Sequence, residues 1–388
     1  MAKDYIAKKI QDAPRVISLL SSDLAKKARQ DGTDIIPLAG APYDLPPEHV
    51  LDAARRAVGE DCRPHPSGLL ELREAIAKKL LEENQIRADP EEEILVTNGA
   101  MQALYVVMLA ILEPGDEVLT PSPAFFFDGL VELAGGRSVY APLLEEERFR
   151  FDIERIEHGV SRRTKVLMVN SPANPTGHVA TRDELAAIAD LADRRDLIVV
   201  SDESFEKFVY DGREHHSIAS FPGMSARTIT VHSFTKSYSM PTWRMGYLAA
   251  RPEMVRHFQK VLEWLVLSCN HVVQKAATAA LLGETAWIDK IVREFEDNRN
   301  LFHRGLEEMA GISCVRPEGG PLLFPNVSQL GMDGEAFSDR ILRDCGIRSE
   351  PGYAFQSPNH VRLHFGGRRK WVEEAVRRLR QTVDRIHG

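Results

Sequence analysis

The strongest constraint on the fold is an alternation of two patterns between about residues 92 and 250. Short runs of apolar and β-branched residues alternate there with amphipathic helical patterns, which is typical of an α/β domain with a largely parallel sheet. Thr181 and Glu184 form a capping box at the start of one such helix, which we expect to cover the sheet. The clearest strands are predicted at 94–97, 166–170, 197–201 and 228–231.

The pattern changes after Gly283, and a chain of 388 residues is longer than one core usually supports. A long charged helix is predicted over 284–309 and an amphipathic helix over about 370–386, which indicates a second, smaller domain. The first 40 residues show no strand alternation, so we expect an arm and a helix that pack on that domain or on a partner subunit. The expected division is 1–40 for the arm and part of the small domain, 41–284 for the large domain, and 285–388 for the small C-terminal domain.

Composition narrows the class of protein. The net charge is −8 and the basic residues are scattered among acidic ones, so no nucleic-acid surface is expected. The first 12 residues lack the apolar stretch of a secretory signal, and the longest apolar run, 103–112, is about half a membrane span. The four cysteines are far apart and suggest neither a disulfide framework nor a metal site. We expect a cytoplasmic enzyme without a metal.

Several polar segments follow predicted strands, and ligands of open α/β sheets bind at strand ends. The segment 98–101 follows one strand and opens a helix whose N-terminal N–H groups could hold a phosphate, although Asn98-Gly99 also suits a plain turn. The segment 171–177 contains two prolines that fix the path of a loop presenting the Asn174 amide. A rigid connector is the alternative interpretation of that loop.

Two further strand ends carry charged residues. Asp202 ends a mostly apolar strand, where a carboxylate needs a cationic partner such as a protonated heterocyclic nitrogen, unless it caps a helix or pairs with a nearby lysine. Lys236 follows another strand, and a lysine in an enclosed site can lose its proton and form an imine with a carbonyl carbon. Arg244, eight residues later, could pair with a phosphate dianion.

Together these segments resemble the class I/II aminotransferases, the large fold-type I family of pyridoxal 5′-phosphate (PLP) enzymes. The resemblance runs from about Ile35 to Gly366 and includes the segments 40–42, 68–77, 97–104, 113–118, 174–177 and 201–247. It implies a large PLP-binding domain with a mostly parallel seven-stranded sheet flanked by helices, plus a smaller α+β domain. It also implies a homodimer with shared active sites.

The resemblance also implies roles for individual residues. Lys236 would hold PLP as a Schiff base and then move the α-proton of the substrate, while Asp202 would pair with the pyridinium nitrogen. Arg362 would receive the substrate α-carboxylate. The remaining cofactor-binding residues would be Gly99, Ala100, Met101, Phe125, Asn174, Phe205, Ser233, Arg244 and Arg63. Gly40, Asn174 and Arg362 would contact the substrate.

Several features depart from the family pattern, including Thr242, which stands next to Arg244 where a glycine is usual. Phe205 stands where a tyrosine usually hydrogen-bonds the 3′-oxygen of the cofactor, and Arg63 stands where a tyrosine usually reaches the phosphate of the neighbouring subunit. The segment Gly319-Gly320-Pro321 lacks the usual aromatic residues and, with Phe205, resembles the capreomycidine synthase type of PLP cyclase.

Two activities therefore stay open. The first is an aminotransferase acting on an L-amino acid and a 2-oxo acid. The second is a PLP-dependent cyclase, lyase or β/γ-replacement enzyme of specialised metabolism. A non-catalytic binding module is disfavoured because Lys236 and Asp202 are both present. The side chain of the substrate is not indicated by the sequence.

Overall fold

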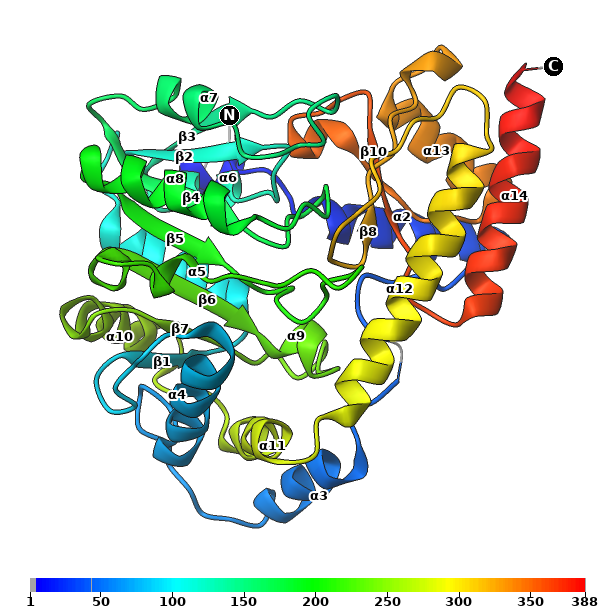
Figure 1. Ribbon diagram of the computed structural model, residues 1–388. Coiled ribbons are helices and arrows are strands. Elements are labelled where there is room, and N and C mark those ends of the chain that lie inside the picture. The colour runs from blue at the N-terminus through cyan, green and yellow to red at the C-terminus, as the bar shows by residue number, and fades with distance from the viewer. Residues whose placement is uncertain (1–4, 43, 388) are drawn as a thin grey trace.

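A large sheet with helices on both faces forms the left-hand part of the molecule in Figure 1, in the computed structural model, which describes residues 5–42 and 44–387. Its strand order is β1-β7-β6-β5-β4-β2-β3, and only β7 runs antiparallel to its neighbours. The expected seven-stranded, mostly parallel sheet is therefore confirmed. The strands are β1 (Ile94–Thr97), β2 (Glu117–Ser122), β3 (Arg137–Pro142), β4 (Thr164–Asn170), β5 (Ile198–Asp202), β6 (Thr228–Ser233) and β7 (Gly246–Ala249).

All four strands expected from the sequence are present, with ends that differ by at most two residues. The strand β4 begins at Thr164, and β6 continues to Ser233. The strand β5 is displaced by one residue and ends on Asp202, because Asp202 still pairs with Val231 of β6. The carboxylate thus lies on the last residue of the strand, at the edge of the sheet where a ligand can reach it.

Helices cover both faces of this sheet because successive side chains of each strand point to opposite faces. In β4, Val166 and Met168 pack against the α5 side, whereas Leu167 and Val169 pack against the α8 side. The predicted capping box at Thr181 and Glu184 is confirmed at the start of α8. The flanking helices are α3 (Glu48–Ala57), α4 (Leu70–Asn84), α5 (Ala100–Ile111), α6 (Asp128–Leu133), α7 (Ile153–His158), α8 (Arg182–Arg194), α10 (Pro252–Val266) and α11 (His271–Leu282).

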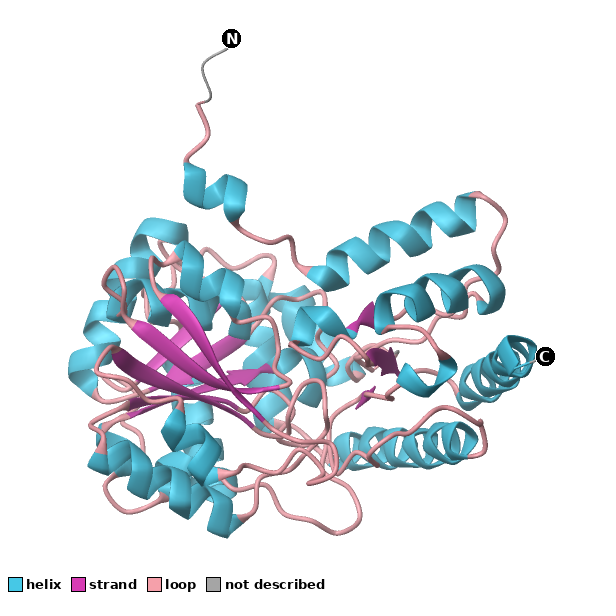
Figure 2. Cartoon of the chain, turned by 90° about the horizontal axis from the view of Figure 1, so that it is seen from above, coloured by secondary structure: helices cyan, strands magenta, loops and turns pink. Residues whose placement is uncertain are grey.

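A second, smaller sheet lies beside the first and has its own apolar core (Figure 2). It is antiparallel, with β10 (Val361–His364) between β8 (Leu322–Leu323) and β9 (Glu350–Pro351). The two long helices predicted after Gly283 are present as α12 and α14. The helices of this region are α2 (Ile17–Gln30), α12 (Ala286–Glu307), α13 (Gly334–Cys345) and α14 (Arg369–His387), with short 3₁₀ turns at Ser328–Leu330 and Gly352–Phe355. Two further 3₁₀ turns, Ile218–Ser220 and Met224–Ala226, lie between β5 and β6 of the large sheet.

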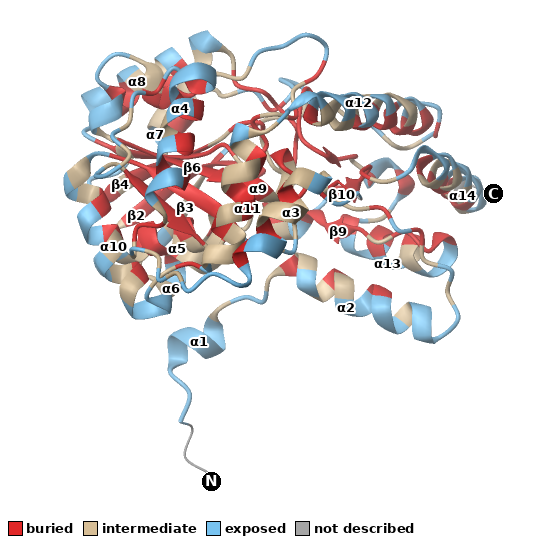
Figure 3. Ribbon diagram, turned by 90° about the horizontal axis from the view of Figure 1, so that it is seen from below, coloured by how far each residue is buried: buried red, intermediate tan, exposed pale blue. Residues whose placement is uncertain are grey.

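The N-terminal segment joins the smaller sheet. The helix α2 contacts α13 and β9, while α1 (Lys8–Asp12) has no buried residue and projects from the body (Figure 3). The assignment of residues 1–40 to an arm and part of the small domain, and the boundaries at residues 40 and 284, stay predictions. All four cysteines are free thiols. Among the described residues, no helix has the length and apolarity needed to cross a membrane.

Candidate active site

A cavity of about 390 Å³ lies between the two sheets, next to the carboxyl ends of β4, β5 and β6. These are the strand ends at which an open parallel sheet presents polar side chains to a ligand. The smaller sheet closes the other side with residues of β8, β9 and β10. The cavity brings together the predicted residues Gly40, Ala100, Met101, Phe125, Asn174, Asp202, Phe205, Ser233, Lys236, Arg244 and Arg362.

Two predicted residues do not line the cavity. Gly99 precedes α5 with a φ of 84°, and a Cβ there would lie 2.5 Å from Nη2 of Arg244. Glycine thus allows the arginine to approach the start of α5 closely. Arg63 is exposed in the loop between α3 and α4 and does not reach the cavity of its own chain. Its expected contact with a neighbouring subunit stays a prediction.

Lys236 lies in α9 (Phe234–Ser237), the short helix that follows β6 directly. The Ser233 Oγ accepts a hydrogen bond from the Thr235 backbone N–H and so fixes the turn that presents the lysine. The Lys236 Nζ forms no hydrogen bond or ion pair with a described residue and lies 5.9 Å from the centre of the Phe205 ring. Burial, with the charges of nearby arginines, lowers the pKa of Lys236 to about 7. A large share of this amine is therefore neutral and nucleophilic near neutral pH.

Asp202 is buried at the end of β5 and has no cationic partner among the described residues. Its Oδ1 accepts hydrogen bonds from the Ser204 backbone N–H at 3.0 Å and from the Ser204 hydroxyl at 2.6 Å. Burial nevertheless raises the pKa of Asp202. A protonated ring nitrogen placed beside Asp202 would supply the missing positive charge and stabilise the carboxylate.

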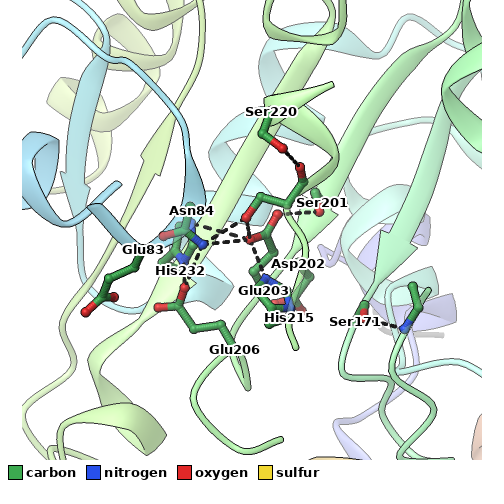
Figure 4. A network of polar contacts seen from close by, with 12 residues as sticks. Glu83, Asn84, Ser171, Ser201, Asp202, Glu203, Glu206, His215, Ser220 and His232 are labelled. Atoms are coloured by element: carbon green, nitrogen blue, oxygen red, sulfur yellow. Dashed lines mark hydrogen bonds and ion pairs between the residues drawn. The ribbon is translucent and has the colours of Figure 1, made fainter. Parts of the chain in front are cut away.

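A buried polar network behind Asp202 holds this part of the chain in place (Figure 4). Glu203 accepts a hydrogen bond from His215 Nε2 at 2.8 Å, and Glu206 pairs with the Lys79 ammonium on α4. The Nδ1 atom of His232 lies 3.3 Å from Glu206 Oε2. Glu203, Glu206 and His232 lie close enough together to bind a metal ion, but Lys79 already supplies positive charge there. We therefore interpret the network as a structural support for Asp202.

The opposite end of the cavity suits an anion. The helix α5 begins there, and its first N–H groups face outward with the positive end of the helix dipole. Arg244 has a φ of 55°, a left-handed conformation that is uncommon for residues other than glycine. Its Nη1 donates to the Pro241 carbonyl at 3.2 Å, which leaves other guanidinium N–H groups for a ligand. A phosphate would fit this end.

The residues between the two ends fit the ring of the cofactor. Oδ1 of Asn174 accepts a hydrogen bond from Arg362 Nη1 at 2.8 Å, while its Nδ2 donates to no described residue. That N–H is therefore available for a ring oxygen. Phe125 borders the same space, with its ring centre 3.8 Å from that of Phe126. The cavity thus brings together a lysine, a carboxylate, an amide and an anion site, a set of groups that fits PLP.

Sequence reasoning did not identify three polar residues of the cavity wall. They are Arg348, Glu350 and His364, all contributed by the smaller sheet or the segment before it. The strand β9 has only two residues, so no apolar alternation marks it in the sequence. The only available signal was the spacing of Arg348 and Glu350, because residues two apart in an extended segment point to the same side.

The fold and the cavity define a PLP-dependent enzyme of the α/β type. A family model described as aminotransferase class I and II matches residues 33–379. The chain is 38% identical to an aspartate aminotransferase of Pyrococcus abyssi, over 90% of this chain and 92% of that one. It is 37% identical to the aromatic-amino-acid aminotransferase 2 of Thermococcus litoralis, over 89% and 90%.

A solved structure gives the same answer. The aspartate aminotransferase from Thermus thermophilus with maleate superposes with a TM-score of 0.93 and 34% identity, covering 98% of this chain and 100% of that one. The chain belongs to the class I and II aminotransferase family. The expected fold, the PLP cofactor and the aminotransferase class of enzyme are thereby confirmed.

Proposed function

We propose that this enzyme transfers the α-amino group of an L-amino acid to a 2-oxo acid in the cavity that contains Lys236, Asp202 and Arg362. The observation that carries the proposal is that all three side chains line one cavity of about 390 Å³. When bound, PLP supplies an electron sink for the electron pair left behind by the departing α-proton.

Each side chain then has a defined task. With PLP bound, Lys236 would take the proton from the substrate α-carbon and donate it again later in the reaction, a task suited to an amine whose pKa is about 7. Asp202 would keep the ring nitrogen protonated, and the Nδ2 of Asn174 would donate to the ring oxygen. Ser233, Arg244 and the start of α5 would hold the phosphate.

Arg362 is proposed to bind the α-carboxylate of both substrates. Its side chain is only 4% exposed, and the centre of its guanidinium lies 4.6 Å from that of the Phe355 ring. A buried guanidinium binds a carboxylate through two parallel N–H donors. The same contact serves the amino acid and the 2-oxo acid, because both carry this carboxylate.

Arg348 suggests an acidic substrate side chain. It lines the cavity and, among the described residues, forms no ion pair with a carboxylate, although its Nη1 donates to Ser22 Oγ at 2.6 Å. The relatives from Pyrococcus abyssi and Thermus thermophilus are described as aspartate aminotransferases, which supports an acidic substrate. Phe126, Leu322 and Val16 line the cavity as well and favour aromatic amino acids as a second group of substrates.

A substrate panel tests both assignments. Purified enzyme is given L-aspartate, L-glutamate, L-phenylalanine or L-tyrosine with a 2-oxo acid acceptor, and products are identified by mass spectrometry. We expect Arg348→Ala to lower kcat/KM for L-aspartate by about 10²-fold, with less than a threefold change for L-phenylalanine. Equal losses for both substrates would contradict the role of Arg348. Cyclised or eliminated products in place of 2-oxo acids would favour the alternative activity, that of a PLP-dependent cyclase, lyase or β/γ-replacement enzyme.

We further propose that the enzyme is a homodimer in the cytoplasm. Large apolar side chains are exposed around the loop that carries Arg63, including Val58 at 72%, Trp264 at 92% and Leu267 at 75%. Hydrogen bonds from Ser67 to Gln259 and from His271 to Ala57 hold these segments together. Exposed apolar side chains of this size are typical of a subunit contact. The free cysteines support a reducing compartment.

A further inference from the structure

Glu350 is a buried carboxylate in the wall of the cavity, and the family comparison gives it no role. Its exposed side-chain fraction is 0%. Three donors surround it: Ser21 Oγ of α2 at 2.9 Å, His364 Nε2 at 2.9 Å and Arg362 Nε at 3.3 Å. Burial alone would raise the pKa of Glu350, but its interactions with His364 and Arg362 hold this pKa well below its usual range. Glu350 is therefore ionised.

The contacts of Glu350 fix one end of Arg362. The guanidinium donates from Nε to Glu350 and from Nη1 to Asn174 Oδ1, so two of its five N–H groups are engaged by the protein. The remaining N–H groups belong to Nη1 and Nη2. These two nitrogens form the fork that binds a carboxylate through both oxygens. Loss of the hydrogen bond from Nε to Glu350 would therefore allow the Arg362 guanidinium to rotate away from the carboxylate that it binds.

His364 strengthens the same arrangement. Its Nδ1 is buried without a hydrogen-bond partner among the described residues and would lie 2.7 Å from a Cβ built on Gly40. A proton on Nδ1 would be an unpaired buried donor, which is unfavourable. Burial lowers the pKa of His364, so the neutral ring donates from Nε2 to Glu350.

We propose that Glu350, held by Ser21 and His364, is a positioning residue that aims the Arg362 guanidinium at the substrate α-carboxylate. The inference rests on the proposed role of Arg362. Glu350 acts through the arginine and does not bind a cationic substrate itself, because both of its oxygens are occupied and its side chain has no exposed surface. Through Ser21, the position of α2 contributes to the affinity for amino acids.

The test compares two ligands that differ only by the carboxylate. L-Alanine and ethylamine are titrated into the holoenzyme, and dissociation constants are read from the absorbance of the bound cofactor. A methyl side chain makes no demand on the acidic or aromatic parts of the cavity. We expect Glu350→Gln to weaken L-alanine binding about 10- to 100-fold and ethylamine binding less than twofold. Ser21→Ala should weaken L-alanine binding alone, about two- to tenfold.

Controls separate the possible failures. Glu145→Gln removes a comparable Glu–His pair, with Glu145 Oε2 at 3.1 Å from His360 Nε2 outside the cavity, and should leave both dissociation constants unchanged. Equal effects of Glu350→Gln on the two ligands, or no effect, would overturn the positioning role. If Glu350→Gln does not fold, the same comparison of L-alanine and ethylamine binding is made with Ser21→Ala. If Arg362→Lys also fails to distinguish the two ligands, the proposed role of Arg362 is wrong instead.

Discussion

At the scale of single residues, the site depends on burying Lys236 and Asp202 without an oppositely charged partner in the described part of the chain. Lys236 and Asp202 line the same cavity, and neither forms an ion pair with a described residue. Burial shifts both pKa values toward the neutral forms, downward for Lys236 and upward for Asp202. A cofactor that bonds to the lysine and places a protonated nitrogen beside the carboxylate removes both penalties at once.

The lowered pKa of Lys236 predicts how the apoenzyme takes up PLP. Only the neutral amine reacts, so the rate of covalent attachment should rise as the pH passes through about 7 and then level off. The rate is measured by reducing the Schiff base with borohydride at set times and determining the mass of the protein by mass spectrometry. Lys236→Ala should show no trapped cofactor. A rate that keeps rising to pH 10, as for an exposed lysine, would contradict the lowered pKa.

At the scale of secondary-structure elements, the site is formed by residues at the ends of strands and the starts of helices. The end of β5 supplies Asp202, the helix after β6 supplies Lys236, and the start of α5 faces Arg244. A hydrogen bond from Arg362 on β10 to Asn174 on the large-sheet side links the two sheets across the cavity. In the proposed function, the large sheet therefore supplies the residues that bind the cofactor, while the smaller sheet supplies Arg362 for the substrate.

Gly99 offers a test of how α5 and Arg244 meet. We expect Gly99→Ala to weaken PLP binding about tenfold, because the added Cβ would lie 2.5 Å from Nη2 of Arg244 and displace it from the phosphate. Gly212→Ala is the matched control, since Gly212 also has a positive φ of 68° but nothing within 4 Å of an added Cβ. Both substitutions should lower stability, but only Gly99→Ala should change the PLP dissociation constant. Equal PLP affinities in the two variants would contradict the contact.

Strand ends and caps were predictable because they follow from local rules. Asp202 and Lys236 follow β-branched runs, and the Thr181 capping box depends on residues three apart, so each was visible in the sequence. Glu350 was not, because its partners Ser21 and Arg362 are separated from it by 329 and 12 residues. Such pairings arise from tertiary packing, which no local pattern reports. The family resemblance identified Arg362, whereas the role proposed for Glu350 comes from its contacts in the folded chain.

At the scale of the whole molecule, Arg63 is a predicted site residue that does not reach the cavity of its own chain. Arg63 is exposed in a loop bordered by the apolar side chains Val58 and Leu70. A two-fold dimer formed through this region would bring each Arg63 to the other subunit, because such interfaces present the same surface on both partners. The active site would then be complete only in the dimer.

Mixed dimers test this arrangement. Lys236→Ala and Arg63→Ala should each reduce activity strongly, and co-expression of the two variants should restore about a quarter of the wild-type activity, since half of the dimers are hybrids with one intact site. The measurement is specific activity alongside sedimentation of the purified mixture. No recovery from a mixture that contains hybrid dimers would show that Arg63 does not act across the subunit boundary.

The central claim is that the cavity around Lys236 moves an amino group between two carbon skeletons. The most direct measurement follows the nitrogen: ¹⁵N-labelled L-aspartate and unlabelled 2-oxoglutarate are incubated with the holoenzyme, and the products are analysed by mass spectrometry. The account predicts that ¹⁵N appears in glutamate, in amounts equal to the oxaloacetate formed, and that Lys236→Ala abolishes this transfer. Consumption of the labelled amino acid with ¹⁵N released as ammonia or kept in a rearranged product would contradict it.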